Sequence, residues 1–462
     1  MVALHPMQPK DLAWFNEVRN HPDTAGYLHD NRVYSLGETK AWFDSEKPLY
    51  WWVEFTRKQV GYIRTSNVNY EEGSITVGMD IDPKFRGKGI AMLAYEELFD
   101  FLRSRLFTRV NLEVLESNDR AIHIYKKLGF VETGSRPHNG ETSLEMTLEL
   151  QKLRAVKVVP LYFGDRRHWP KGQRDSKHVL GLMNYLIAKE KEVDPGIDCD
   201  TVFVINKASD EDVVTDRESA AVCDATVRGL HGAQTPRGQV FVQDRENKGV
   251  SFASYDQMFH EHRDKYNVWF FCEDDQVIVK DNVVSSALPR LRDLSVPVGF
   301  VATVGVAPTP KPHAHGGCGI TTRGVLDEVL KATQDLAFKK QQHAIISKYQ
   351  RERRAVDFDK ATAPATYLGR SHLPCYFPSE GTGLGIGNKE IEILGEVSFT
   401  WCINWLGCSL TNHELEKINV NWKNAGHNKN KAHLWLDGVL RNCHGEAVRM
   451  VPYTEDMDSA ML

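Results

Sequence analysis

The stretch DPKFRGKGIAM, residues 82–92, joins an alternating apolar segment to a strongly helical one. Its two glycines, Gly87 and Gly89, are interleaved with Arg86 and Lys88. Glycines allow close approach to the backbone, and a helix start presents unpaired N–H groups and partial positive charge. Taken alone the loop predicts only a turn. Placed between a strand and a helix, it predicts a cradle for a phosphate group.

Two well-known phosphate loops do not match this stretch. The Rossmann fingerprint GxGxxG is absent, and the preceding strand does not open a βαβ unit. A Walker loop is excluded because no GK[ST] follows the glycines. The flanking segments must therefore decide which cofactor the loop serves.

Periodicity around the loop predicts a mixed α/β unit. Helices are expected near residues 10–19, 89–107 and 116–130, and strands at 50–68, 74–82, 109–115, 131–136 and 143–150.

Two motifs in this order resemble the GNAT acetyltransferase superfamily over nearly all of residues 1–150. The pyrophosphate motif Arg/Gln-x-x-Gly-x-Gly/Ala is matched by Arg86, Gly89 and Ala91. The second motif, Asn-x-x-Ala-x-x-x-Tyr-x-x-x-Gly-Phe, is matched by Asn118, Ala121, Tyr125, Gly129 and Phe130. The resemblance implies the GNAT fold, a mixed and splayed central sheet with flanking helices, over residues 1–152.

The resemblance also implies acetyl-CoA as cofactor, with backbone amides of the loop holding its pyrophosphate. These residues are Arg86, Gly87, Lys88, Gly89, Ile90 and Ala91. The preceding strand would splay at a bulge near Met79 to Ile81, where a backbone N–H would polarise the thioester carbonyl.

The same resemblance gives Tyr125 the role of protonating the departing thiolate, while the alternative is a packed helix tyrosine. Asn118 is either a cofactor contact or a helix cap. For the base that deprotonates the acceptor we favour Glu54, with Asp80 and Asp82 as rivals on or beside the central strands.

The entry segment resembles the branch that acetylates amino sugars or protein N-termini. In that branch an Arg-Asn pair and a Trp-Phe helix shape the acceptor pocket. Arg19, Asn20, Trp42 and Phe43 match them here. The implied acceptor is an amino sugar or another amine.

A new pattern of alternating strands and helices begins near residue 156 and predicts a second α/β domain. Its segment NVWFFCEDDQVIV ends an aromatic strand with Glu273, Asp274 and Asp275. Three adjacent acids repel one another, so they favour either exposure, as in an acidic turn, or neutralisation by a cation.

The surroundings of this cluster resemble GT-A-fold, family 2-like glycosyltransferases over about 157–410. Asn247, Gly249 and Ser251 match an Asn-x-Gly-x-Ser segment, and the three acids stand for an Asp-x-Asp motif whose first Asp is here Glu. The implied fold is a Rossmann-type α/β sheet over 156–410, with 411–462 as a C-terminal extension.

The glycosyltransferase resemblance implies a nucleotide-sugar donor and a glycan or small-molecule acceptor. Asn247, Gly249, Glu273 and Asp274 would contact the donor. Asp275 would hold Mn²⁺ or Mg²⁺ bridging the diphosphate, with His315 as a further ligand or donor contact. Glu396 is the candidate base, and Glu392 is its rival.

Charge and composition narrow the possible functions and locations of the protein. The formal net charge of −5 does not indicate that the chain as a whole binds nucleic acid or a membrane surface. The 8 cysteines all follow residue 198 without a CxxC pair, which favours free thiols and a cytoplasmic location. No run of about 18 apolar residues predicts a membrane span.

The sequence therefore predicts a bifunctional transferase: an acetyl-CoA-dependent N-acetyltransferase followed by a metal-dependent glycosyltransferase in glycan or glycoconjugate synthesis. Two alternatives remain for the second domain. It binds glycan or nucleotide without turnover, or it glycosylates hydroxylated bases in DNA.

Overall fold

The computed structural model describes residues 2–162, 187–207, 217–246, 250–273, 276–303, 306–307, 313–314 and 317–332, with short stretches between 366 and 442. The chain divides into two compact units. The first comprises Met1–Lys152 and Leu288–Val296, and the second comprises Leu153–Ala287 and Pro297–Leu462. Within the described ranges, no helix has the length and apolar character needed to cross a membrane.

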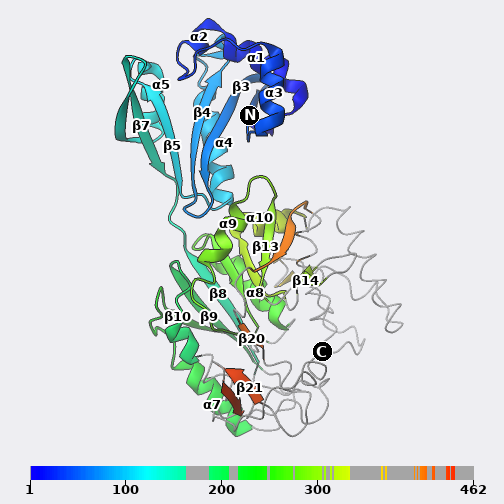
Figure 1. The fold of residues 1–462 in the computed structure, drawn as a ribbon. Coiled ribbons are helices and arrows are strands. Elements are labelled where there is room, and N and C mark those ends of the chain that lie inside the picture. The colour runs from blue at the N-terminus through cyan, green and yellow to red at the C-terminus, as the bar shows by residue number, and fades with distance from the viewer. Residues whose placement is uncertain are drawn as a thin grey trace, which may run out of the picture. The chain divides into compact units, whose positions relative to one another are not determined.

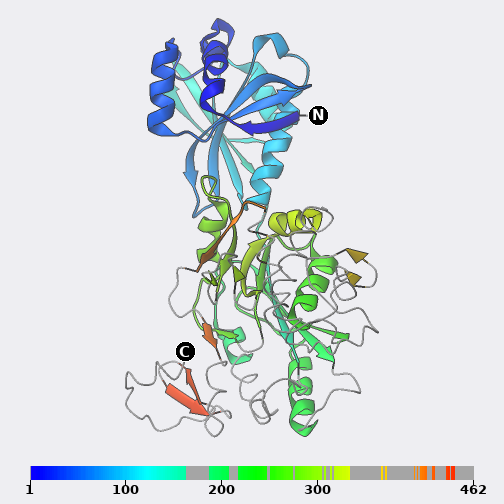
Figure 2. The ribbon, with the colours of Figure 1, turned by 90° about the vertical axis from the view of Figure 1, so that its right-hand side faces the viewer.

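The first unit is built on one seven-stranded sheet in the order β1-β2-β3-β4-β5-β7-β6 (Figures 1 and 2). Its strands are β1 (Val2–Pro6), β2 (Trp51–Phe55), β3 (Lys58–Asn69), β4 (Ser74–Ile81), β5 (Arg109–Leu115), β6 (Val131–His138) and β7 (Glu141–Glu149). Its helices are α1 (Leu12–Asn20), α2 (Pro22–Ala25), α3 (Leu36–Glu46), α4 (Ile90–Ser104) and α5 (Asp119–Lys127), with 3₁₀ turns η1 (Pro9–Asp11) and η2 (Pro83–Phe85). The mixed α/β character expected from the sequence is confirmed.

Helix α4 forms because its apolar residues recur at helical spacing. Ile90, Ala94, Leu98 and Leu102 are at most 2% exposed and join the larger core of the unit. The helix ends at Ser104, earlier than the expected 107, because Leu106 adopts a left-handed backbone with φ 61°.

Helices α1 and α3 contribute to a second, smaller core against β2 and β3. Phe15 of α1 packs edge-on against Tyr62 of β3, with ring centroids 4.7 Å apart, and Trp42 of α3 joins them. Helix α3 begins at a capping box in which Ser35 and Glu38 bind each other's backbone N–H groups.

Strands β4 and β5 are parallel but pair over only three residues, Ser74 to Thr76 with Arg109 to Asn111. Beyond Thr76, β4 continues along β3 while β5 continues along β7. The sheet therefore splays, and one edge of β4 is left unpaired by strands from Val77 onward.

The expected bulge near Met79 to Ile81 is absent from the β3–β4 ladder. The register is continuous from Ile81 back to Thr76, and its one irregularity lies on β3 between Ser66 and Asn69. The early end of the β4–β5 pairing, rather than a bulge at 79–81, opens the sheet.

The second unit contains a seven-stranded sheet in the order β10-β9-β8-β11-β16-β13-β19. The strands are β8 (Ala155–Leu161), β9 (Cys199–Lys207), β10 (Val240–Glu246), β11 (Val268–Phe271), β13 (Val298–Ala302), β16 (Gly319–Thr322) and β19 (Ser409–Asn412). Strands β8 to β11 are parallel, β16 is antiparallel to β11 and β13, and β19 is parallel to β13.

Helices and short ladders complete the described part of this unit. The helices are α7 (Arg217–Arg228), α8 (Val250–His262), α9 (Leu288–Arg292, counted with the first unit) and α10 (Arg323–Ala332), with the 3₁₀ turn η3 (Ser285–Ala287). The short pairs are β12 (Gln276–Ile278) with β20 (Asn419–Asn421), β14 (Val306–Ala307) with β15 (His313–Ala314), β17 (Thr366–Tyr367) with β18 (Arg370–Ser371), and β21 (His433–Leu436) with β22 (Val439–Asn442).

The sheet of the second unit has a topological switch point between β8 and β11. From β8 the chain passes to β9 on one side, and later to β11 on the other. Ligands of open α/β sheets bind in the crevice outside the carboxyl ends of strands at such a point. Glu273 follows β11 at this end of the sheet.

A short segment from the later chain, Leu288–Val296, belongs to the first unit. Arg292 is 2% exposed, and its guanidinium donates to the backbone carbonyls of Leu106 (3.0 Å), Tyr70 (2.7 Å) and Glu71 (2.6 Å). Gly73 makes room for it, because a Cβ there would lie 2.6 Å from the guanidinium carbon. No pattern in the sequence predicts this contact.

We expect Arg292→Ala to destabilise the first unit by about 3 kcal/mol, because buried carbonyls lose a charged donor. Hydrogen–deuterium exchange should accelerate in peptides covering 69–74 and 104–110. The exposed neighbour Arg290, replaced by Ala, is the matched control. Equal exchange in the two variants would show that the Arg292 contacts contribute nothing.

Candidate active site

A cleft of about 630 Å³ opens where the first unit splays. Its walls are the end of β4 (79–81), the loop at 83–89, the first turn of α4, the inner face of α5 and part of the α2 segment. The glycine loop, the open edge of β4 and Tyr125 thus meet in one place.

The glycine loop has the backbone that the sequence suggested. Gly87 and Gly89 have φ of 79° and 74°, a left-handed conformation that residues with side chains adopt only with strain. Gly89 precedes the first residue of α4 and supplies no side-chain cap, and the first turn holds no acidic residue. The N-terminal N–H groups of α4 therefore face the cleft as a site suited to an anion. Ile90 and Ala91 also line it.

The two cations of the loop lie differently. The Lys88 ammonium sits 5.2 Å from the centroid of the Phe85 ring. Arg86 instead turns toward protein groups: its guanidinium donates to the Ile81 carbonyl (2.8 Å), the Asp23 carbonyl (2.9 Å) and the Thr24 hydroxyl (2.7 Å). Arg86 thereby fastens the loop to the end of β4 and to the α2 segment.

The open edge of β4 presents the backbone groups of Met79 and Ile81. Asp82 donates its N–H to the Val60 carbonyl of β3 (2.9 Å). In an antiparallel pair, successive residues point their backbone N–H and C=O groups alternately toward the partner strand and away from it. Asp80 therefore points its backbone groups toward β3, as Asp82 does, and Met79 and Ile81 point theirs away. The contact from Arg86 to the Ile81 carbonyl is consistent with that direction.

Helix α5 brings Tyr125 to the cleft. Its side chain is 8% exposed and meets the Tyr95 and Phe130 rings edge-on, with centroids 5.9 and 5.8 Å away. Burial raises the pKa of Tyr125, which keeps the phenol protonated at neutral pH. Asn118 lines the cleft and also caps α5, accepting from the Ala121 N–H (3.2 Å).

Three basic residues of α5 that the sequence motif does not include also line the cleft. They are Arg120, His123 and Lys127. A Cβ on Gly87 would lie 3.9 Å from an Arg120 guanidinium nitrogen, so this side chain reaches the loop. Their spacing of three and four residues was the available signal, because it places all three on one helix face.

Comparison with known proteins assigns a family to part of the chain. The family model described as acetyltransferase (GNAT) domain matches residues 2–131. This region is a GNAT acetyltransferase domain.

Several curated proteins are similar to the chain. The spermidine N(1)-acetyltransferase of Escherichia coli (strain K12) is 27% identical over 148 residues, 30% of this chain and 76% of that protein. The spermidine N(1)-acetyltransferase of Vibrio cholerae is 22% identical over 139 residues, which are 29% of this chain and 80% of that protein. N-alpha-acetyltransferase RimI of Mycobacterium tuberculosis is 38% identical over 73 residues, which are 16% of this chain and 42% of that protein.

Among solved structures, the spermidine N-acetyltransferase of Vibrio cholerae in complex with CoA and spermine has a TM-score of 0.31 and 22% identity. The match covers 32% of this chain and 95% of that chain.

The three carboxylates considered as the base of the GNAT domain do not all lie at the cleft. Glu54, the favoured base, does not line the cleft; it pairs with His5 on β1, 3.2 Å away. Asp82 is 7% exposed and accepts from the Lys84 N–H (3.0 Å), which stabilises η2. Of the three carboxylates, only Asp80 lines the cleft. The register of β3 and β4 and the alternation of side chains along them place Asp80 there.

The residues expected to shape the acceptor pocket do not line the cleft and have structural contacts in the GNAT domain. Arg19 donates to the Arg32 and Asp30 carbonyls, at 2.6 and 2.9 Å, and Asn20 donates to the Tyr34 carbonyl, at 2.7 Å. Trp42 and Phe43 pack in the smaller core.

Most residues predicted for the second site lie outside the described part of the chain. These are Asn247, Gly249, Asp274, Asp275, His315, Glu392 and Glu396. Glu273 is described and follows β11. Within the described ranges, no group of three or more His, Cys, Asp or Glu residues could hold a metal ion.

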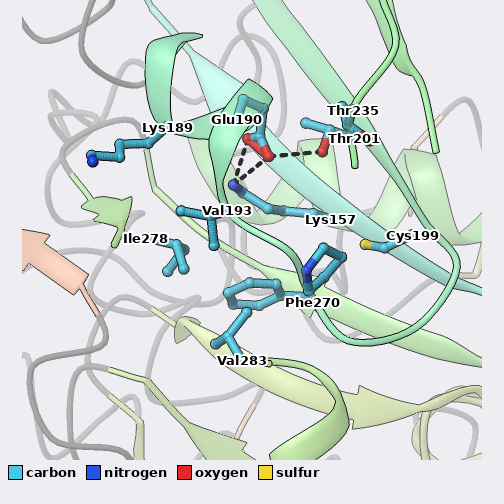
Figure 3. A pocket seen from close by; sticks show the side chains of 11 residues that line it. Lys157, Lys189, Glu190, Val193, Cys199, Thr201, Thr235, Phe270, Ile278 and Val283 are labelled. Atoms are coloured by element: carbon cyan, nitrogen blue, oxygen red, sulfur yellow. Dashed lines mark hydrogen bonds and ion pairs between the residues drawn. The ribbon is translucent and has the colours of Figure 1, made fainter. Parts of the chain in front are cut away.

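A small cavity of about 30 Å³ lies in the second unit beside a buried ion pair (Figure 3). Lys157 of β8 donates to both Glu190 carboxylate oxygens, at 2.8 and 2.5 Å, and Thr201 donates to one of them, at 3.1 Å. Burial is the largest single effect on Lys157 and lowers its pKa, but Glu190, Cys272 and Cys199 together raise the pKa overall. The cavity has room for one or two waters and not for a sugar nucleotide.

We expect the buried tyrosines to make the GNAT domain sensitive to alkaline pH. Burial raises the pKa of Tyr125, so its contribution to stability is present below pH ~10 and is lost as pH rises above that value. The melting temperature of Tyr125→Phe should therefore fall less than that of wild type between pH 8 and 11. Tyr27→Phe, at a residue 48% exposed, is the control and should follow wild type. An equal fall in Tyr125→Phe would contradict the assignment.

Proposed function

We propose that the first unit transfers the acetyl group of acetyl-CoA to an amine. The observation that carries this proposal is the meeting, in one cleft, of a left-handed glycine loop, an open strand edge and a buried phenol. Its support is independent of the family match, because each part follows from backbone geometry and burial.

The residues present fit acetyl-CoA. The uncapped N-terminus of α4 and the space above Gly89, where a Cβ would have no neighbour within 4 Å, suit a pyrophosphate. Arg120, His123 and Lys127 supply positive charge along the same cleft. When bound, acetyl-CoA supplies an activated thioester.

Each remaining role falls to a residue of the cleft. The N–H groups of Met79 and Ile81 point away from β3 and would donate to the carbonyl oxygen as negative charge develops on it. The Tyr125 phenol would give its proton to the departing sulfur. Asp80 would accept the proton of the acceptor amine, in place of Glu54. Arg86 would position the loop rather than bind phosphate.

We propose a small aliphatic amine as the acceptor class. The relatives named spermidine N(1)-acetyltransferase favour a polyamine, whereas the sequence resemblance favoured an amino sugar or a protein N-terminus. A panel of spermidine, glucosamine and a short peptide distinguishes these acceptors.

Replacing Gly89 by Ala tests the cofactor assignment. Gly140 is the matched control, because it has φ 83° and open space like Gly89 but does not line the cleft. Each Ala substitution should cost about 1 kcal/mol of stability through backbone strain. By isothermal titration, CoA affinity should fall at least tenfold in Gly89→Ala and stay unchanged in Gly140→Ala, because only the first Cβ enters the phosphate site. Equal CoA affinity in both variants would refute the cradle.

For the second unit we propose a metal-dependent, nucleotide-sugar glycosyltransferase of GT-A type. Support comes from the predominantly parallel half of the sheet, the switch point between β8 and β11, and the acidic residues that start with Glu273 at that end. Asp275 and His315 would hold Mn²⁺ or Mg²⁺, and Glu396 would be the base. The donor contacts would be Asn247, Gly249, Glu273 and Asp274.

Thermal shift of the full chain tests the second proposal. UDP-, GDP-, CDP- and dTDP-sugars, each with and without Mn²⁺, should include one donor that raises the melting temperature only with metal. Asp275→Asn should abolish that shift while the shift with acetyl-CoA persists. No shift with any sugar nucleotide would refute the proposal, and a shift without sugar transfer would indicate a binding unit.

A further inference from the structure

An ion pair lies on the splayed sheet of the first unit, beside the cleft. Arg64 of β3 places a guanidinium nitrogen 3.0 Å from the Asp80 carboxylate of β4. The Arg64 side chain is 35% exposed and that of Asp80 is 13% exposed. Asp80 therefore borders the cleft while its partner approaches from the neighbouring strand.

The strand register explains why the two side chains meet. Tyr62 is directly opposite Asp80 and Arg64 is directly opposite Gly78, so these side chains share one face of the sheet. Arg64 reaches Asp80 diagonally by lying across Gly78. A Cβ on Gly78 would be 2.9 Å from an Arg64 nitrogen and 3.2 Å from its guanidinium carbon.

The ion pair uses only part of the hydrogen-bonding capacity of Arg64. One guanidinium nitrogen contacts the Asp80 Oδ2. Among the described residues, the Arg64 Nε has no hydrogen-bond partner. Asp80 lines the cleft and Arg64 does not, so the guanidinium holds from behind a carboxylate that lies beside the cleft.

We infer that Arg64 is a positioning residue that fixes the Asp80 carboxylate for proton transfer from the acceptor amine, with Gly78 providing the space for it. This inference rests on the proposed acetyltransferase function. Tyr62 lies directly opposite Asp80 on β3, and its side chain is buried in the smaller core.

The chemistry requires only one proton movement at this pair. Asp80 would take a proton from the amine nitrogen as that nitrogen forms its bond to the acetyl carbon. The carbon–sulfur bond of the thioester would break, and the CoA thiolate would leave with the proton of Tyr125. Arg64 keeps its own proton throughout and holds the carboxylate in one orientation. A misplaced base can cost about 100-fold in rate even when every other group is present.

The test measures turnover and cofactor binding separately in Arg64→Gln, Arg64→Lys and Gly78→Ala. We expect kcat for amine acetylation to fall roughly 10- to 100-fold in Arg64→Gln, with CoA affinity unchanged. Arg64→Lys should restore part of the lost rate, because an ammonium keeps the charge. Gly78→Ala should lower kcat in the same direction by displacing the guanidinium.

Arg109→Gln is the matched control, because Arg109 forms a cross-strand pair with Glu149 (2.8 Å) on the same sheet, away from the cleft. Its kcat should equal that of wild type. Guanidinium ion added to Arg64→Ala should raise its rate, a response that lost stability alone would not give.

Failure of this inference is distinguishable from failure of the proposed function. Wild-type protein that acetylates no amine overturns both. Wild-type turnover that persists in Arg64→Gln and Gly78→Ala overturns the inference alone. A fall in CoA affinity that parallels the fall in kcat also overturns it, because the pair would then support the whole cleft.

Discussion

The cleft of the first unit depends on the early end of hydrogen bonding between β4 and β5. Three residues of parallel pairing hold the two strands together, and each then follows its other neighbour. Continued pairing would occupy the outward-facing N–H groups of Met79 and Ile81. Their release creates the unpaired edge, and the helices α4 and α5 supply the two further walls.

Around that opening, the walls carry different groups. The loop, α4 and α5 contribute helix N–H groups, left-handed glycines and basic side chains, all of which favour phosphate. The end of β4 contributes Asp80, which is paired with Arg64. Arg86 links the two sides through backbone carbonyls and the Thr24 hydroxyl, so its charge serves the construction of the cleft.

The second unit follows a different plan. The order in which its parallel strands are added changes direction between β8 and β11, and the first of the acidic residues predicted from the sequence, Glu273, follows β11. The small cavity beside Lys157 and Glu190 is lined by charges that neutralise each other, and it is too small for a substrate. The carboxyl edge of the sheet is therefore the better candidate for a ligand site.

The sequence by itself determined the mixed α/β character of the first unit, the glycine loop and the tyrosine of α5. These follow from local patterns: apolar periodicity, glycine between a strand and a helix, and motif spacing within one helix. Tertiary structure alone decided which carboxylate borders the cleft, because strand register places Asp80 at the opening and Glu54 two strands away. It also decided the partners of Arg86, Arg64 and Arg292, since each guanidinium reaches groups that are adjacent only after the strands and turns have packed.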